Sequence, residues 1–382
     1  MRICYFGTYR ANYVRNRLMI ERLRGQGAEV VECHATLWRG LEDREAVAGG
    51  GWLSLNFWRR AATAYGQLLK RYRQIGDYDV LMVGYPGQPD LPLALLLTRL
   101  RGKPLVWDVL MSIFLIAEER GLRGKSSLSL WLIRQLEQLA CRLPDLLLID
   151  TAEYAAWFHK TYGVTDERVR LLPLGADDRV FRPLSSPGVA RRNISSEESE
   201  GFLCLYYGTF IPNHGVRVII EAARRLRDYS DIRFELVGQG PEREKMVALA
   251  ENYGLTNVTF VDWLEVEALV QRAASAEVLL GTFGITPQAL FTMHNKIHEG
   301  LAMAKPVING DSPVMRSTLQ HGEHIFLCER ENPKALVEAI LTLRDDAVLR
   351  ERLSRQGYAY YREHFAFETI GRRLVEYLES VV

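Results

Sequence analysis

Short apolar segments alternate with amphipathic segments along this chain, and the alternation occurs in two series. In the first series the apolar runs predict strands, and the 3.6-residue periodicity of Tyr13–Gly25 predicts a helix. The predicted strands are Arg2–Phe6, Glu29–Cys33, Val80–Val83, Pro104–Asp108, Leu146–Asp150 and Val169–Leu172. Strands that alternate with helices in this way pair in parallel through right-handed crossovers. The first series therefore predicts a doubly wound α/β domain.

The second series repeats this pattern after a break. Its predicted strands are Phe202–Tyr207, Arg233–Val237, Val258–Val261, Glu277–Thr282, Pro306–Ile308 and Ile325–Cys328. Its predicted helices are Gly215–Arg227, Pro333–Leu343, Ala347–His364 and Ile370–Val382. Between the series, Pro183–Gly201 loses periodicity and gains Ser, Pro, Gly and charge, which is typical of a linker.

These patterns predict four parts of the chain. Residues 1–182 form a first Rossmann-like domain, 183–201 a linker, 202–364 a second Rossmann-like domain, and 365–382 a helix that packs back on the first domain. A length of 382 residues agrees with two domains. We expect the two domains to face each other across a cleft.

Composition excludes several classes of protein. Lys and Arg number 48 and Asp and Glu 47, which argues against a nucleic-acid binder. The five cysteines lie far apart and form no CxxC pair, which indicates a reduced, cytoplasmic protein without a structural zinc site. The start of the chain lacks the pattern of a signal peptide, and no apolar run approaches the roughly eighteen residues that a membrane span needs.

The segment Thr282–Pro306 carries the clearest chemical pattern. A buried strand enters a Gly- and Pro-containing loop, and the helix that follows carries Asn295, Lys296 and Glu299 on its first turns. Open α/β sheets bind ligands at the carboxyl ends of their strands, and helix N-termini accept phosphate oxygens. The segment therefore predicts a site for a phosphorylated ligand, most simply a nucleotide. The alternative is an ordinary surface pair of Lys296 and Glu299.

Two more loops follow predicted strands of the same domain. The first is Gly208–Gly215, with Thr209 and His214 inside it, and the second begins at Gly238. Each alone is also explained as a turn. Neither domain carries G-x-G-x-x-G after its first strand, which disfavours an NAD dehydrogenase. Together with the helix of Lys296, the loops predict one ligand site.

The second series resembles the donor-binding domain of the family 4 retaining glycosyltransferases, which have the GT-B fold of two facing Rossmann-like domains. The resemblance rests on YGTFIPNHGV, IIEAARRL, LVGQGPER, NVTFVDWL and NKIHEGLAMAKPVI, between residues 207 and 308. The first series resembles the family more weakly, through VWDV, IDTAEY and LLPLGADDRVFRP.

The resemblance implies roles for individual residues. It implies that Glu299 binds the nucleotide ribose, that Thr292 to Asn295 offers N–H groups to the sugar or phosphate, and that Gly208–Gly215 holds the diphosphate. Together with the pattern of the loops, it predicts donor binding by Gly208, Thr209, His214, Gly215, Gly238, Thr292, Asn295, Lys296 and Glu299.

This chain departs from the family pattern at three positions. Phe291 stands eight residues before Glu299, where many members have a second glutamate, and Thr209 and His214 replace an Arg and a Lys. Because negative charge develops on the departing diphosphate, we assign its neutralisation to Lys296, His214 and helix N-termini. This makes a metal ion or other cofactor unnecessary.

Further candidates lie in the first series. Asp108 ends a predicted strand and is a candidate catalytic residue, with a helix N-cap as the alternative. Gly7, Tyr9, Arg10 and Arg15 are candidates for the cleft and the acceptor side.

The basic and aromatic segment Phe57–Ile75 is typical of a peripheral contact with the inner face of a membrane. Its alternative is a solvated helix face over a core.

The sequence thus predicts a metal-independent retaining glycosyltransferase of polysaccharide or glycolipid biosynthesis. It would move a sugar from a nucleotide diphosphate sugar to an alcohol acceptor: a glycan, a glycolipid, another lipid-linked alcohol or a small molecule. Two alternatives stay open: a sugar-nucleotide epimerase of GT-B architecture, and a non-catalytic nucleotide-binding subunit of a polysaccharide assembly complex.

Overall fold

A computed structural model describes residues 1–38, 43, 47, 50–184 and 201–382. These residues form two compact units, Met1–Leu174 with Glu368–Val382, and Gly175–Phe367. The sequence placed the first boundary at residue 182, and most of the predicted linker 183–201 lies outside the described residues. Within the described ranges, no helix has both the length and the apolar character that crossing a bilayer requires.

The first unit contains a six-stranded parallel sheet in the order β2-β1-β3-β4-β5-β6. Its strands are β1 (Arg2–Gly7), β2 (Glu29–His34), β3 (Val80–Val83), β4 (Leu105–Leu110), β5 (Leu146–Ile149) and β6 (Val169–Leu171). The strands β3, β4 and β5 are buried along their whole length, as expected for a parallel sheet with helices on both faces.

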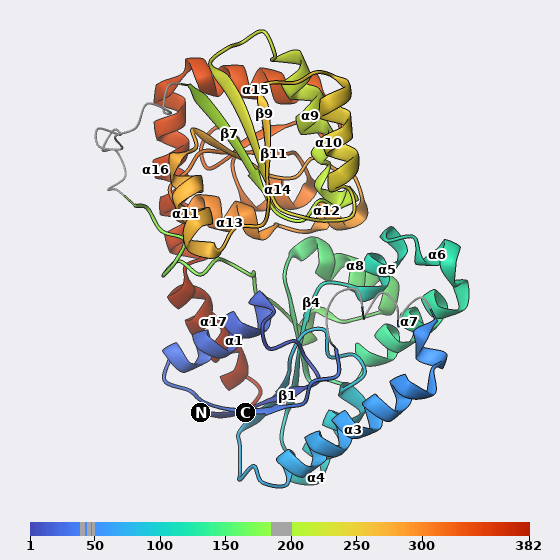
Figure 1. Ribbon diagram of the computed structural model, residues 1–382. Coiled ribbons are helices and arrows are strands. Elements are labelled where there is room, and N and C mark those ends of the chain that lie inside the picture. Colours follow the sequence, from blue (N-terminus) through green and yellow to red (C-terminus); the bar gives the residue numbers. More distant parts are fainter. Residues whose placement is uncertain (39–42, 44–46, 48–49, 185–200) are drawn as a thin grey trace. The chain divides into compact units, whose positions relative to one another are not determined.

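Helices cover both faces of this sheet (Figure 1). On one face lie α1 (Val14–Gly25) and α17 (Phe367–Glu379), and the Tyr377 hydroxyl donates to the Leu171 carbonyl over 3.3 Å. On the other face lie α3 (Leu55–Tyr72), α4 (Leu91–Arg101) and α8 (Ala152–Tyr162). Between β4 and β5 the chain forms α5 (Ile113–Glu119), α6 (Leu122–Lys125) and α7 (Ser127–Ala140). Short 3₁₀ turns occur at η1 (Gly51–Leu53) and η2 (Asp166–Arg168).

The second unit has its own six-stranded parallel sheet, in the order β12-β11-β10-β7-β8-β9. Its strands are β7 (Phe202–Tyr207), β8 (Ile232–Val237), β9 (Val258–Val261), β10 (Val278–Leu280), β11 (Val307–Gly310) and β12 (Phe326–Cys328). The strand order reverses between β10 and β7, so the loops after these two strands diverge, and ligands bind at such a point in open α/β sheets.

Helices again lie on both faces (Figure 1). One face carries α9 (Val216–Arg225), α10 (Arg243–Asn252) and α15 (Pro333–Asp345), whose buried side chains form a core with β7 and β8. The other face carries α11 (Val266–Ser275), α13 (Asn295–Ala302) and α16 (Ala347–His364). The remaining elements are η3 (Pro212–His214), α12 (Pro287–Phe291) and α14 (Pro313–Thr318). Two parallel doubly wound units confirm the predicted α/β class.

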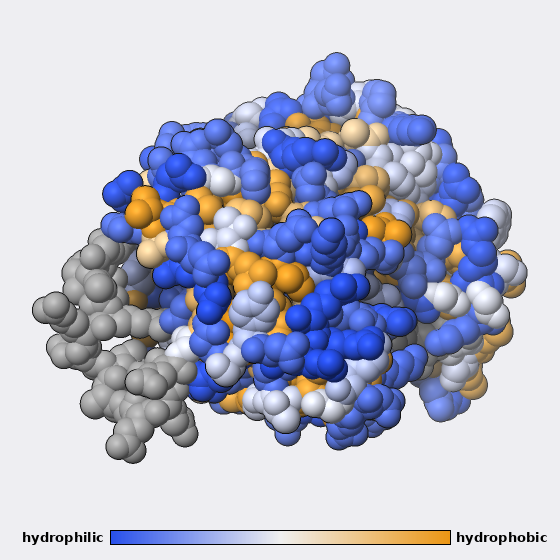
Figure 2. Space-filling view, turned by 90° about the horizontal axis from the view of Figure 1, so that it is seen from above, coloured by the Kyte–Doolittle hydropathy of each residue, from blue (hydrophilic) through white to orange (hydrophobic). Residues whose placement is uncertain are grey.

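Hydrophilic residues cover most of the face shown in Figure 2, with hydrophobic residues in smaller areas between them. All five cysteines are buried and carry free thiols. Burial raises the pKa of the Cys204 and Cys141 thiols, so these side chains behave as core residues rather than nucleophiles.

Candidate functional site

The turn after β7 is built on glycines that accept no side chain. Gly208 has φ +140°, and a Cβ atom there would lie 3.1 Å from Lys296 Nζ. Gly215 has φ +63°, and its Cβ would lie 2.4 Å from the backbone nitrogen of Gly284, in the loop after β10. L-residues with a side chain rarely adopt such φ values. Both the backbone angle and the lack of space for a Cβ atom therefore favour glycine at these two positions. The turn therefore packs closely against Lys296 and the β10 loop.

Lys296 lies in the first turn of α13 with its ammonium group at this turn. Its Nζ atom lies 4.0 Å from the centre of the Tyr206 ring and 3.5 Å from His214 Nδ1, and the residue is 6% exposed. Burial lowers the pKa of Lys296 to about 7, and Glu299 opposes this shift. A buried cation beside a helix N-terminus is a strong site for an anion.

Glu299 lies one turn further along α13. Burial raises the pKa of its carboxyl to about 7, while a hydrogen bond with the Tyr207 hydroxyl and the charge of Lys296 act in the opposite direction. The same Tyr207 hydroxyl lies 3.5 Å from the Lys296 carbonyl oxygen. The Glu299 carboxylate is thus held in place by a strand residue and shares its surroundings with Lys296.

Two histidine rings complete this cluster. The rings of His214 and His294 lie 5.2 Å apart at 80°, and His214 Nδ1 lies 2.8 Å from the Tyr206 hydroxyl. Burial, followed by the charge of Lys296, lowers the pKa of His214 well below its ordinary range. The same two causes lower the pKa of His294 to about 3. A neutral His214 ring can supply hydrogen bonds rather than charge.

The loop after β8 closes against the turn after β7. Gly238 has φ +136°, and a Cβ atom there would lie 2.0 Å from the Gly208 carbonyl oxygen. The Thr209 carbonyl accepts a hydrogen bond from the Tyr206 hydroxyl over 3.2 Å. Thr292 is buried just before α13, and Asn295 is the first residue of that helix. The structure therefore brings all nine predicted donor-site residues to the carboxyl-terminal edge of one sheet.

The sequence analysis missed Arg330, which follows β12 at the same edge. Its Nε donates to the Asp311 carbonyl and its Nη1 to the Gly284 carbonyl, each over 2.7 Å. Arg330 is 9% exposed, and its charge is one of the causes that lower the pKa of His294. A basic residue two positions after a predicted strand was the signal that the sequence offered. Tyr206 was also missed, because it looked like any aromatic residue of a buried strand.

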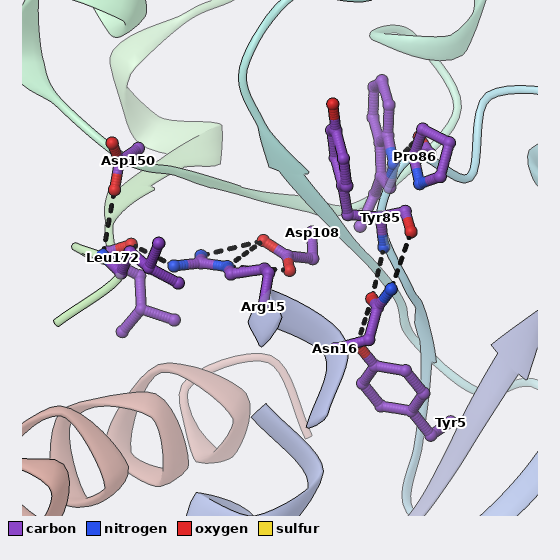
Figure 3. A network of polar contacts seen from close by, with 10 residues as sticks. Tyr5, Arg15, Asn16, Tyr85, Pro86, Asp108, Asp150 and Leu172 are labelled. Atoms are coloured by element: carbon purple, nitrogen blue, oxygen red, sulfur yellow. Dashed lines mark hydrogen bonds and ion pairs between the residues drawn. The ribbon is translucent and has the colours of Figure 1, made fainter. Parts of the chain in front are cut away.

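The first unit holds a buried ion pair where cleft residues were predicted (Figure 3). Arg15 Nη2 lies 2.8 Å from Asp108 Oδ1, and both side chains are fully buried. Arg15 Nε donates to Asp108 Oδ2 over 3.0 Å, and Nη1 donates to the Leu172 carbonyl over 3.0 Å. The guanidinium and the carboxylate thus satisfy each other. The structure thus gives Asp108 and Arg15 a structural role within the first unit, and the predicted roles in catalysis and on the acceptor side stay predictions.

The other predicted acceptor-side residues lie near β1. Gly7 has φ +134°, and a Cβ atom there would lie 2.6 Å from an Asp90 carboxylate oxygen. The Tyr9 hydroxyl donates to Glu32 over 3.2 Å, and the Tyr9 ring is 2% exposed. The Arg10 carbonyl accepts from the Asn16 amide over 3.1 Å. Gly7 and Tyr9 are thus part of the packing, whereas the Arg10 side chain is partly exposed.

Two pairs of residues with metal-binding side chains, His294 with His298 and Asp177 with Asp178, make other contacts. His298 packs its ring 4.8 Å from that of Phe365, whereas His294 contacts His214. Asp177 pairs with Arg179, and Asp178 accepts from the Phe367 backbone. In the part of the chain that the structure describes, no three His, Cys, Asp or Glu side chains are grouped to hold a metal ion.

Residues 201–346 match the protein family described as "Glycosyl transferases group 1". The lipopolysaccharide core biosynthesis glycosyltransferase LpsD of Rhizobium meliloti is 27% identical over 190 residues, 50% of this chain and 52% of its own. The α-D-kanosaminyltransferase of Streptomyces kanamyceticus is 24% identical over 73% of this chain and 71% of its own. The family match lies within the second unit, and both relatives carry the names of glycosyltransferases.

The matched region spans about half the length of some curated relatives: 52% of LpsD and 44% of an uncharacterized glycosyltransferase of Methanocaldococcus jannaschii. Among solved structures, sucrose-phosphate synthase of Thermosynechococcus elongatus has a TM-score of 0.74 at 15% identity, covering 99% of this chain and 98% of its own. HepE of Anabaena, in complex with UDP and glucose, has a TM-score of 0.67 at 16% identity over 100% of both chains. These likenesses confirm the GT-B fold.

Proposed function

We propose that this protein is a retaining glycosyltransferase that moves a sugar from a nucleotide diphosphate sugar to an alcohol acceptor. The observation that carries the proposal is the ammonium group of Lys296, held in the turn between β7 and α9 by Tyr206 and His214. It lies at the N-terminus of α13, where backbone N–H groups and the helix dipole also favour an anion.

In this proposal the second unit binds the donor. Gly208 and Gly215 let the backbone approach the diphosphate, and Lys296 neutralises one of its oxygens. Glu299 accepts hydrogen bonds from the ribose hydroxyls, a task that suits a carboxylate because it only accepts. The neutral His214 ring donates a hydrogen bond to a phosphate oxygen rather than adding charge.

The reaction breaks the bond between the anomeric carbon and the diphosphate oxygen. The bonding electrons leave with the diphosphate, where Lys296 stabilises the charge that develops in the transition state. The acceptor hydroxyl attacks from the same face, and its proton passes to the departing phosphate oxygen. Same-face attack is favoured over a double displacement because Asp108, the predicted acid of the first unit, is buried against Arg15.

Two further properties belong to this proposal. The cation at the diphosphate is a lysine, so we propose that catalysis needs no divalent metal. The five buried free cysteines fit a protein that works in a reducing compartment such as the cytoplasm.

A panel of nucleotide sugars tests the proposed function. A glycosyltransferase of this kind slowly hydrolyses its donor when no acceptor is present, so one donor should release free nucleotide. UDP-glucose is the first donor to test, because the structural neighbour HepE has been crystallised with UDP-glucose. Conversion of a nucleotide sugar to its epimer without release would favour the epimerase alternative. Binding without any turnover would favour a non-catalytic subunit.

A further inference from the structure

The outer face of α7 is apolar, although it points away from the core of the first unit. The helix buries Ser129, Leu130, Glu137 and Ala140. Four other large apolar side chains of the helix are exposed: Leu128 by 57%, Trp131 by 55%, Leu132 by 36% and Leu139 by 49%. Positions at i, i+3, i+4 and i+11 form one stripe along a helix. The helix therefore carries apolar side chains on both its inner and its outer face.

A second exposed apolar segment lies beside the start of α7. Leu53 is 73% exposed, Leu55 64% and Trp58 57%, in η1 and the first turn of α3. The Trp52 indole Nε1 donates to Ser129 Oγ over 2.9 Å, which ties η1 to α7 next to Leu128. Because Trp52 and Ser129 are the sequence neighbours of Leu53 and Leu128, the two exposed sets lie near each other. We call them the apolar surface: Leu53, Leu55, Trp58, Leu128, Trp131 and Leu132. Exposed apolar groups gathered in this way mark interaction sites.

Basic side chains accompany the apolar surface in the part of the chain that the structure describes. Arg59, Lys125 and Arg134 are exposed, and the Arg134 guanidinium lies 5.7 Å from the centre of the Phe114 ring. The one acid of α7, Glu137, is buried and accepts hydrogen bonds from Ser112, Ile113 and Tyr162. Arg123 forms an ion pair with Glu118. Among the residues that the structure describes, no ion pair is formed by Arg59, Lys125 or Arg134, so the surface combines Leu and Trp with basic side chains.

This surface differs from the one that the sequence suggested in Phe57–Ile75. There, Arg60 pairs with Asp43, and the Tyr65 hydroxyl donates to Asp90 over 2.9 Å. The Tyr72 ring is buried. Some of the basic and aromatic side chains of α3 therefore form contacts within the first unit. Only the start of α3 contributes to the apolar surface.

We propose that the apolar surface binds the interface of a membrane that contains anionic lipids. Leu and Trp side chains partition into the boundary between headgroups and acyl chains, and nearby Lys and Arg are attracted by anionic lipids. A second copy of the chain is the less favourable occupant. A symmetric contact would bring Lys125 and Arg134 of both copies together. This interaction lies beyond sugar transfer and uses none of the proposed donor-site residues.

Vesicle sedimentation with the full chain tests this assignment without any substrate. We expect the wild type to sediment with vesicles of equal parts phosphatidylcholine and phosphatidylglycerol, and much less with phosphatidylcholine alone. The double variant Leu128→Glu/Trp131→Glu should lower the bound fraction about tenfold. Lys125→Glu/Arg134→Glu should lower binding to the anionic vesicles only. Val348→Glu is the matched control, because Val348 is 78% exposed on α16 and should bind as the wild type does.

The results of these experiments distinguish a membrane from a second copy of the chain as the partner of the apolar surface. Vesicle binding that is absent in the wild type, or unchanged in Leu128→Glu/Trp131→Glu, overturns the proposal. A concentration-dependent dimer in light scattering that this double variant abolishes, without vesicle binding, would assign the surface to a second copy instead. Thermal unfolding checks that each variant is folded. Nucleotide release is measured without vesicles, so failure of the proposed transferase function and failure of membrane binding are distinguishable.

Discussion

Lys296 Nζ lies 3.5 Å from His214 Nδ1, and burial, followed by the charge of Lys296, lowers the pKa of the His214 imidazole well below its ordinary range. Two residues from different segments therefore divide the work at the proposed diphosphate site. Lys296 supplies the charge, and His214 supplies a directed hydrogen-bonding group. The proposed mechanism therefore depends on the positive charge of Lys296.

Lys296→Ala is expected to lower turnover more than it weakens donor binding, because the benefit of the cation grows as the diphosphate departs. Steady-state kinetics with the donor found in the panel measure kcat and KM separately. Lys334→Ala is the control, since the Lys334 side chain is 76% exposed on α15. Turnover that survives within about threefold would assign the charge to another cation, with Arg330 the first to examine.

Glu299→Gln is expected to weaken nucleotide binding by roughly 1 to 3 kcal/mol, the cost of losing a charge-assisted hydrogen bond in a buried site. Isothermal titration calorimetry with the nucleoside diphosphate measures this difference. Glu267→Gln, an exposed substitution on α11, is the control. Equal affinities of the folded Glu299→Gln variant and the wild type would remove Glu299 from the ribose site.

Nucleotide affinity is expected to be greatest near pH 7 and to fall on both sides. Burial lowers the pKa of Lys296 to about 7, so the free protein loses this charge as pH rises and binding must then take up a proton. Burial raises the pKa of Glu299 to about 7, so below that pH the protonated acid no longer accepts from two hydroxyls. Lys296→Ala should abolish the alkaline fall and Glu299→Gln the acid fall. If nucleotide affinity in both variants depends on pH as it does in the wild type, these roles of Lys296 and Glu299 are contradicted.

Asp108→Ala is expected to destabilise the fold by about 3 to 5 kcal/mol, because it leaves the buried Arg15 guanidinium without its carboxylate. Replacing both partners, as in Arg15→Met/Asp108→Leu, should cost less than Asp108→Ala alone. Chemical denaturation measures both. If Asp108→Ala keeps wild-type stability but loses turnover, the catalytic role predicted for Asp108 would be supported.

The sequence was most informative where chemistry and local geometry coincide. Lys296 and Glu299 stand three residues apart, so a helix places them on neighbouring positions whatever the rest of the fold does. Gly208 follows an apolar strand directly, and its close approach to Lys296 explains why no side chain is present there. The alternation of strands and helices likewise predicted both parallel sheets.

Contacts between residues that are far apart in the sequence could not be predicted from local patterns. Arg15 and Asp108 are paired across 93 residues, and nothing near either residue indicates that pairing. The ammonium group of Lys296 lies over the Tyr206 ring, and Arg330 joins the loops of Asp311 and Gly284. Such contacts depend on strand order and register, which the sequence pattern does not specify.

The central claim is that the second unit binds a nucleotide sugar and activates its diphosphate with Lys296 instead of a metal ion. Nucleotide release from a panel of UDP-, GDP- and ADP-sugars, measured in excess EDTA, tests this claim. The account predicts slow release from one donor by the wild type, unchanged by EDTA and strongly reduced in Lys296→Ala. Release that stops in EDTA and returns only with Mg²⁺ or Mn²⁺, or release that Lys296→Ala leaves at the wild-type rate, would contradict it.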